Sequence, residues 1–153
     1  MSIEARQPHI LIIDSAPAIL ELLRELFEGE GFRVSTRSVV PSRLEEVKEL
    51  QPSLIIFDHL RQGETGWSLL CSLQRDADMR AVPVVLCTGA MREVEERADH
   101  LVAAGVAVVR KPFDIDELMT VVENARLRRP PRTQGAMTAP APRGRRAAGA
   151  FGR

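Results

Sequence analysis

The sequence contains no apolar run approaching the roughly 18 residues that a membrane-spanning helix requires. Its first residues also lack the succession of basic, apolar and small residues that marks a signal peptide, so we expect a cytoplasmic protein. Cysteine is equally scarce, since only Cys71 and Cys87 occur, which argues against a small secreted disulfide scaffold. Both lie in apolar stretches, and we interpret them as reduced, buried packing residues.

Glycine-rich phosphate loops are also missing. The chain has neither a Walker loop ending in Gly-Lys nor a GxGxxG turn, which argues against the nucleotide-binding α/β proteins that carry these loops. It shows no internal repeat at the level of sequence, which argues against a solenoid.

Acidic residues are absent from the last part of the chain. Eight of the 21 Lys and Arg residues lie from Arg126 onward, where no Asp or Glu occurs, so the first 125 residues carry a net charge of −8 although the whole chain is neutral. This part has almost no large apolar side chains and cannot bury enough surface to offset the cost of ordering. We expect a short extension over residues 1–8, one domain over 9–127 and a disordered basic tail, rich in Pro, Ala, Gly and Arg, over 128–153.

The tail contains a small basic cluster at residues 143–146, which fits binding to nucleic acid or to an acidic membrane surface by charge. Apart from Phe151, however, it lacks the aromatic side chains that stack on bases. We therefore interpret the tail as a linker or solubilising segment and expect no direct binding to nucleic acid.

The body of the chain is an alternation of short apolar runs and helical patterns. The predicted strands cover residues 10–13, 32–36, 54–57, 84–87 and 106–109. Each is followed by a predicted helix with an apolar face, formed in turn by Ile19, Leu22, Leu23, Leu26 and Phe27; by Leu44, Val47 and Leu50; by Trp67, Leu70 and Leu73; by Val94, Ala98, Leu101 and Val102; and by Leu118, Val121, Val122 and Ala125. The order is therefore strand then helix, five times over.

The ends of two predicted helices carry recognisable signals. Asp14 or Ser15 can cap the first helix, with Pro17 in its first turn, and Asp114 three residues before Glu117 makes a capping-box-like start for the last. The strands are apolar throughout rather than alternating, which is typical of parallel strands covered by helices on both faces. We predict an α/β, flavodoxin-like fold: a doubly wound (βα)5 domain with a parallel five-stranded sheet, in a three-layer sandwich.

Four polar residues follow predicted strands: Asp14, Asp58, Thr88 and Lys111. Ligands of open parallel sheets bind at the carboxyl ends of the strands, so these side chains are expected to converge. Singly, each could be a helix cap or a solvated loop residue, but the set of four is harder to explain in that way. Paired carboxylates suit Mg²⁺, which proteins often hold through one or two carboxylates together with water and a phosphate. The predicted site has the groups that phosphoryl transfer requires.

Four blocks of the sequence resemble the signature blocks of response-regulator receiver domains of two-component systems. They are residues 10–17, 52–66, 83–89 and 110–113, within a match over 9–126. Asp58 ends an apolar strand with Gly66 eight residues on, and a Lys-Pro-Phe triplet starts at Lys111, where the family has it.

The resemblance implies a role for each site residue. Asp58 would be the phosphoacceptor, attacking a phosphohistidine on a sensor histidine kinase or phosphotransfer protein. Asp14, Asp58 and the backbone carbonyl of Leu60 would ligate Mg²⁺. Lys111 would neutralise charge on the phosphoryl oxygens, and Thr88 would turn inward to hydrogen-bond one of them, followed by the next loop. The protein would not be an enzyme beyond its own phosphorylation and dephosphorylation.

The sequence departs from the family pattern at several positions. Ser15 stands where the family usually has a second acid, so we expect weak Mg²⁺ binding, with Ser15 acting weakly or through water. Val108 occupies the position of the usual switch aromatic, so output would have to travel through the loop and helix after Thr88. Gln62 replaces a common proline and Gly89 a common alanine.

The alternative function is a pseudo-receiver that binds a partner or dimerises without phosphorylation. Ser15 and Val108 favour it, whereas the intact acceptor, first acid, threonine and lysine oppose it. A phosphatase of the aspartyl-nucleophile class needs a second Asp two residues after Asp58, where Leu60 stands. We interpret His59 as a solvated loop residue, with an effect on the lifetime of the phosphoryl group as the other reading.

No helix-turn-helix or other output domain is recognisable after the receiver-like segment. We therefore expect a stand-alone receiver whose output runs through a downstream protein partner. A homodimer is an open alternative, and the kinase, the signal and the partner are not identified by the sequence.

Overall fold

The computed structural model describes residues 7–58 and 63–127, and all statements about structure below concern those residues. Their sheet has five parallel strands in the order β2-β1-β3-β4-β5. The strands are β1 His9–Ile13, β2 Arg33–Arg37, β3 Leu54–Phe57, β4 Val84–Thr88 and β5 Ala107–Arg110. The order reverses between β1 and β3, which is the switch point of a doubly wound sheet.

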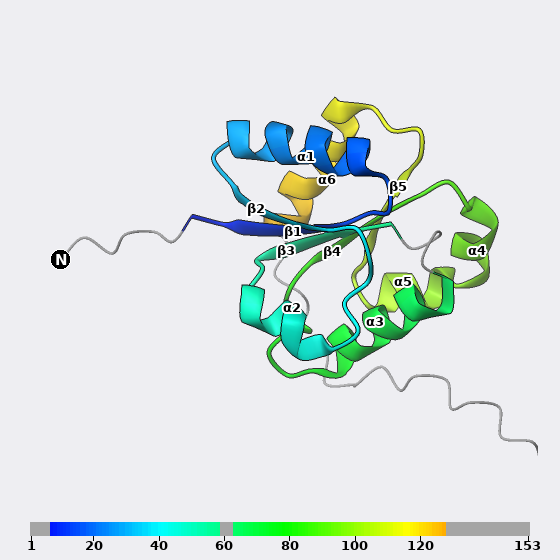
Figure 1. Cartoon of the computed structure of the whole chain (residues 1–153). Coiled ribbons are helices and arrows are strands. Elements are labelled where there is room, and N and C mark those ends of the chain that lie inside the picture. Colours follow the sequence, from blue (N-terminus) through cyan, green and yellow to red (C-terminus); the bar gives the residue numbers. More distant parts are fainter. Residues whose placement is uncertain (1–6, 59–62, 128–153) are drawn as a thin grey trace, which may run out of the picture.

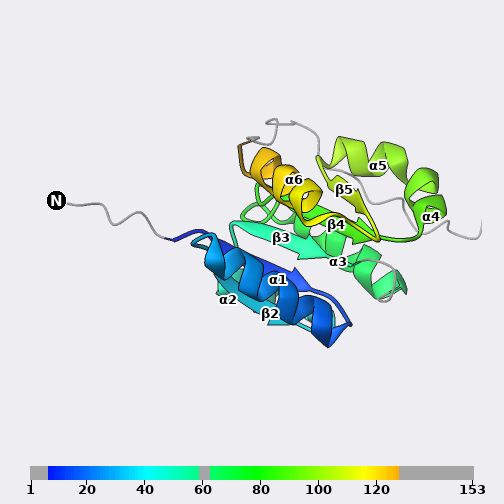
Figure 2. The ribbon, with the colours of Figure 1, turned by 90° about the horizontal axis from the view of Figure 1, so that it is seen from above.

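Helices cover both faces of the sheet (Figure 1). They are α1 Pro17–Gly29, α2 Leu44–Leu50, α3 Gly63–Arg75, α4 Met91–Glu96, α5 Ala98–Ala103 and α6 Ile115–Leu127. Helices α1 and α6 lie on one face, and α2, α3 and α5 lie on the other. Seen from above, α4 lies at the periphery of the molecule (Figure 2). The predicted three-layer (βα)5 fold is confirmed.

The side chains of each strand alternate between the two faces of the sheet, so neighbouring residues pack in different layers of the core. Ile10 and Ile12 of β1 pack in a cluster with the α1 and α6 side chains, which include Phe27. Leu11 and Ile13 pack in a second cluster with α2, α3 and α5. Burying one such side chain contributes about 1.5–3 kcal/mol. Strands buried on both faces explain why the sequence shows continuous apolar runs.

The start of α1 differs from the prediction. Its N-cap residue is Ala16, without a side-chain cap, and Pro17 occupies the first turn as expected. Asp14 does not cap the helix; its Oδ1 accepts a hydrogen bond from the Ala16 N–H at 2.8 Å. The other oxygen of Asp14 accepts from Lys111, so the carboxylate braces the turn and faces the carboxyl end of the sheet. Leu22, expected on the inner face, is 43% exposed.

The predicted fourth helix is two short helices, and the prediction of one was wrong. Between α4 and α5, Arg97 has φ −115° and ψ 13°, which ends the first helix before the second begins. Val102, expected on the apolar face, is 79% exposed, whereas Leu101 is buried. Strands β2 and β5 start one residue later than predicted.

Both thiols are free, as predicted, but only Cys87 is buried; Cys71 is half-buried. Burial raises the pKa of Cys87 to about 12, and it also raises the pKa of Cys71. Neither thiol is therefore activated as a nucleophile. Within residues 7–58 and 63–127, no helix combines the length and apolar character needed to span a membrane.

Candidate functional site

The carboxyl ends of β1 and β3 bring Asp14 and Asp58 together. The two strands are neighbours in the sheet, with Ile13 opposite Phe57, and each Asp directly follows the last residue of its strand. The Asp58 N–H donates to the Ile13 carbonyl at 2.9 Å, so the backbone fixes the acceptor position against β1. Both aspartates are buried, at 3% exposure each.

Lys111 lies between the two carboxylates and bridges them. Its Nζ donates to Asp14 Oδ2 at 2.7 Å and to Asp58 Oδ2 at 3.1 Å. Its backbone N–H donates to the Thr88 carbonyl at 2.8 Å, which aligns the end of β5 with that of β4. Burial alone would lower the pKa of Lys111, but the hydrogen bonds to the two carboxylates outweigh it and raise this pKa above its ordinary value. The ammonium therefore stays charged at neutral pH.

The Lys111–Pro112 peptide bond is cis.

Thr88 ends β4 and is fully buried. Its Cα is paired with that of Arg110, the residue before Lys111. Its Oγ1 accepts a hydrogen bond from the Ala90 N–H at 3.2 Å. The hydroxyl is thus engaged with the start of α4. Gly89 has open space where an alanine methyl would lie, so nothing in the packing requires the glycine.

Ser15 provides a test of whether the residues present suit Mg²⁺. Its Oγ is buried and has no hydrogen-bond partner among the described residues. A buried hydroxyl without a partner is costly, and a site that is completed by an ion with its water shell relieves that cost. Together with the adjacent carboxylates of Asp14 and Asp58, the donor set consists of oxygen atoms only, which suits Mg²⁺.

The donor set is nevertheless small. No group of three or more His, Cys, Asp or Glu side chains fit to hold a metal occurs in the described part of the chain. The predicted backbone ligand Leu60, together with His59 and Gln62, lies outside the described residues.

The position of the missing switch aromatic, Val108, lies in the middle of β5 and is half-buried. It packs against the cluster that contains Leu86 and Leu101. An aliphatic side chain here fills space in the core and offers no ring that could exchange between buried and exposed positions.

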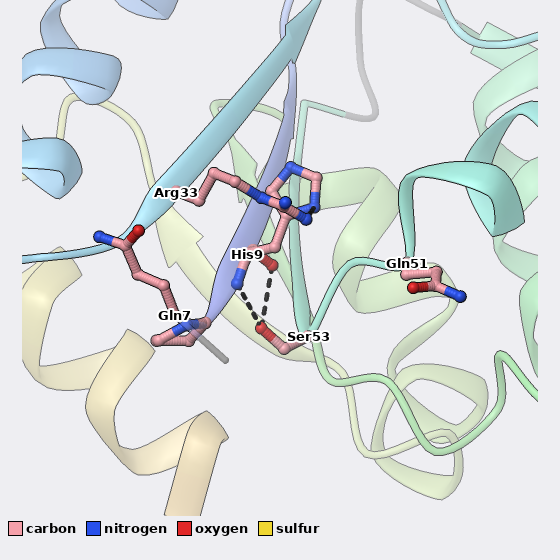
Figure 3. A pocket seen from close by; sticks show the side chains of 6 residues that line it. Gln7, His9, Arg33, Gln51 and Ser53 are labelled. Atoms are coloured by element: carbon pink, nitrogen blue, oxygen red, sulfur yellow. Dashed lines mark hydrogen bonds between the residues drawn. The ribbon is translucent and has the colours of Figure 1, made fainter. Parts of the chain in front are cut away.

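No motif in the sequence singles out His9, which forms a polar cluster at the opposite, amino end of the sheet (Figure 3). Its ring is 5% exposed; Nδ1 lies 2.7 Å from the Leu50 carbonyl and Nε2 lies 2.7 Å from Ser35 Oγ. These partners assign the proton to Nδ1, which donates to the carbonyl, and leave Nε2 to accept from the serine. Burial lowers the pKa of His9, and nearby Arg33 lowers it further.

A cavity of about 500 Å³ opens beside His9, lined also by Gln7, Pro8, Arg33, Gln51 and Ser53. The side chain of Ser53 is bound to the backbone of His9, accepting from its N–H at 2.8 Å and donating to its carbonyl at 3.0 Å. Gln7 donates to the Gly31 carbonyl at 2.7 Å. These polar groups thus tie strands and loops together, and we interpret the cluster as structural.

The family described as the response regulator receiver domain matches residues 10–123 of this chain. The phosphate regulon transcriptional regulatory protein PhoB of Rhizobium meliloti (strain 1021) is 33% identical over 122 residues, which cover 80% of this chain and 53% of PhoB. The DNA-binding response regulator MtrA of Mycolicibacterium smegmatis is 31% identical over 126 residues, which cover 82% of this chain and 53% of MtrA. The chain thus spans about half the length of these curated relatives.

A solved structure of the response regulator protein TrrA from Thermotoga maritima, in complex with Mg²⁺ and BeF, is similar in fold. It superposes with a TM-score of 0.64 at 25% identity, and the match covers 78% of this chain and 99% of that one. The family match spans both aspartates, the threonine and the lysine described above. The chain therefore belongs to the response regulator receiver domain family of two-component signalling proteins.

Proposed function

We propose that this receiver accepts a phosphoryl group on Asp58 from a sensor histidine kinase or phosphotransfer protein, and that it switches a protein-interaction surface in response. The observation that carries the proposal is the position of Lys111, whose Nζ lies within 3.1 Å of carboxylate oxygens of both Asp14 and Asp58. A charged ammonium beside a strand-end carboxylate can neutralise the negative charge of a phosphoryl group that this carboxylate accepts.

Each residue has a part in this proposal. A carboxylate oxygen of Asp58 attacks the phosphorus of a phosphohistidine, whose bond from nitrogen to phosphorus breaks as an acyl phosphate forms. The Lys111 ammonium moves from the Asp58 carboxylate onto the incoming phosphoryl oxygens. Thr88 lies 30 residues after Asp58 and is buried at the end of β4. Its hydroxyl donates a hydrogen bond to one of these oxygens. Placing these groups accounts for most of the catalysis, because phosphoryl transfer depends mainly on positioning and charge neutralisation.

Mg²⁺ fits the same pocket. Asp14, Asp58 and the Leu60 carbonyl would hold it, with Ser15 acting through water, and when bound it would supply positive charge to the phosphoryl oxygens. The complex of TrrA with Mg²⁺ and BeF supports this assignment by analogy. We expect the binding to be weak because Ser15 replaces a carboxylate.

The wider context follows from the same assignment. A cytoplasmic location agrees with the two free thiols, since disulfides are rare in that compartment. The receiver would act through a downstream protein partner, or through a second copy of the chain, and not as an independent enzyme. The domain boundaries at residues 9 and 127 remain part of this proposal, and the basic tail over residues 128–153 lies outside the described residues.

The proposal is tested by intact-protein mass spectrometry after incubation with a small-molecule phosphodonor, with and without Mg²⁺. We expect a Mg²⁺-dependent gain of one phosphoryl group, which is lost in Asp58→Asn. Asp76→Asn is the matched control, because Asp76 is also ion-paired with a lysine, Lys48 at 3.0 Å, but lies in the turn after α3. No gain in a folded protein at saturating Mg²⁺ would overturn the proposal in favour of a phosphorylation-independent pseudo-receiver.

A further inference from the structure

Two segments that follow site residues along the chain meet at one side chain, Trp67. Helix α3, which carries Trp67, begins five residues after Asp58, and α4 begins three residues after Thr88. The guanidinium carbon of Arg97, at the junction of α4 and α5, lies 4.2 Å from the centroid of the Trp67 ring. The ring of His100 in α5 meets the same indole edge-on, with centroids 6.3 Å apart. Trp67 therefore joins the helix after the acceptor to the helix pair after the switch threonine.

The α4–α5 segment, residues 91–103, is held to the domain by few buried side chains. Helix α4 has no buried residue, and α5 has only Leu101. Neither helix has a side-chain N-cap, and Arg97 between them is not helical. Elements with so few buried contacts open and shift at low cost compared with the core. The contacts of Arg97 and His100 with Trp67 are thus a substantial part of what positions this segment.

The packing around the indole contains two small voids. Two cavities of about 10 Å³ each adjoin Trp67. One is lined by Leu86 and Val94 among others, and the other by Leu70 and Ala104 among others. Cavities of this size are at the lower limit for holding a water molecule, so they are small packing defects beside the ring and not a solvent-filled space.

The start of α4 is tied directly to Thr88. Ala90 is the N-cap residue of α4, and its N–H donates to Thr88 Oγ1 at 3.2 Å. If the hydroxyl turns toward a phosphoryl oxygen, this acceptor leaves the helix N-terminus. The change begins at Ala90, directly before the α4–α5 segment, and Arg97 lies within two turns of helix from it.

We propose that the contact between Trp67 and Arg97 couples phosphorylation of Asp58 to the position of the α4–α5 segment. The inference rests on the proposed function. The contact holds α4–α5 against α3 before phosphorylation, and it is released when Thr88 withdraws from Ala90. Trp67 and Arg97 are positioning residues. Trp67 lies in α3 and Arg97 lies at the junction of α4 and α5, and together they supply an aromatic contact that Val108, in β5, cannot make.

Intrinsic fluorescence tests this coupling in the full chain, because Trp67 is the only Trp and the chain has no Tyr. We expect Mg²⁺ and a small-molecule phosphodonor to raise acrylamide quenching of Trp67 by about twofold at full phosphorylation. The rise should follow the phosphorylated fraction measured by mass in the same sample. Amide hydrogen exchange over residues 91–103 should accelerate in parallel, and neither change should occur in Asp58→Asn.

The variant Arg97→Gln removes the cation above the ring. We expect it to gain the phosphoryl group as the native chain does, while quenching and exchange are already high before phosphorylation and no longer respond. Arg97→Lys restores a cation and should recover part of the response. Arg92→Gln is the matched control, since Arg92 is an exposed arginine of α4 that pairs with Glu96 at 3.5 Å; it should respond like the native chain.

The outcomes separate this inference from the proposed function. Phosphorylation measured by mass, without any change in Trp67 quenching or in exchange over residues 91–103, would overturn the coupling and leave the proposed function intact. A full response in Arg97→Gln would overturn it as well. If no phosphoryl group is gained, the proposed function fails, and the coupling fails with it.

Discussion

Lys111 keeps two buried carboxylates at the same end of the sheet, and this role is independent of phosphorylation. The side chains of Asp14 and Asp58 are 5% and 4% exposed, and Lys111 Nζ contacts both. Replacing the lysine with methionine leaves two like charges with little solvent to separate them. We expect Lys111→Met to lower the free energy of unfolding by about 2 kcal/mol in the absence of divalent metal, measured by urea denaturation in EDTA.

The control for Lys111→Met is a double variant that also replaces one of the two carboxylates. In the double variant with Asp58→Asn, the Asp14 carboxylate no longer faces a second carboxylate, so most of the lost stability should return. A double variant no more stable than Lys111→Met would contradict the repulsion between the carboxylates.

Ser15 limits the charge of the pocket, and the variant Ser15→Asp should strengthen metal binding. Two unit charges 4 Å apart interact by about 4 kcal/mol at an effective dielectric near 20, and the cost of desolvating a third carboxylate beside two buried ones offsets much of this. We expect Mg²⁺ affinity to increase about tenfold, which corresponds to about 1.4 kcal/mol, in a titration followed by calorimetry.

Without metal, the same variant should be less stable than the native chain, because it adds a third carboxylate to the pocket. Ser15→Ala separates charge from the loss of the hydroxyl: it removes the buried Oγ that has no partner among the described residues, and it should leave Mg²⁺ affinity within about twofold. Unchanged affinity in Ser15→Asp would show that the missing acid is not what limits binding.

At the scale of elements, His9 ties β1 to β2 and to the end of α2, through Ser35 and Leu50. His9→Asn removes the bond to Ser35, and the native chain should be more stable than the variant by about 1–2 kcal/mol at pH 7.5. The pKa of His9 is lowered in the folded protein, so the unfolded chain takes up a proton first as the pH falls below about 6.5. The stabilisation is therefore complete above that pH and is lost as the pH falls toward the folded-state pKa.

Urea denaturation of both proteins between pH 7.5 and pH 5 measures this effect. The difference in unfolding free energy between native chain and variant should narrow on acidification. His100→Asn is the matched control, because it replaces an exposed histidine that lies outside the His9 cluster. A gap that widens at low pH would mean that protonation stabilises the cluster.

The helices and strands differ in how accurately they can be predicted from the sequence alone. Strands β1, β3 and β4 are continuous apolar runs, and both their existence and their carboxyl ends were predictable. The break at Arg97 was not, because no Gly or Pro marks it and only the packing of α4 and α5 against the domain decides it. The same holds for α1, where Asp14 was expected to cap the helix but its carboxylate also accepts from Lys111, 97 residues away in sequence.

At the scale of the whole molecule, the convergence of Asp14, Asp58, Thr88 and Lys111 was predictable because parallel strands bring their carboxyl ends to one edge. The bridging of both carboxylates by one ammonium was not, since it depends on the exact reach of Lys111. The His9 cluster and the contact between Trp67 and Arg97 were also missed. Each joins residues from distant segments whose types, taken alone, fit an ordinary surface or core position.

The two core clusters lie entirely within residues 10–125, which predicts that the domain is stable without the basic segment that follows. A chain ending at Leu127 keeps all of α6 and therefore both clusters. We expect its free energy of unfolding in urea to lie within about 0.5 kcal/mol of that of the full chain, with the phosphoryl gain at Asp58 retained.

A chain ending at Asp114 is the informative comparison, because it lacks α6. It removes Leu118 and Val122, which are fully buried where α6 packs on β4 and β5, and it exposes the apolar face of the sheet that α1 alone does not cover. A typical domain is stable by only about 5–15 kcal/mol. The loss of Leu118 and Val122 alone need not exceed this stability, but the shorter chain loses every contact of α6, and the sum of these losses does. We therefore expect this shorter chain not to fold cooperatively. A loss of more than about 1 kcal/mol in the chain ending at Leu127 would instead mean that residues after 127 contribute to the folded domain.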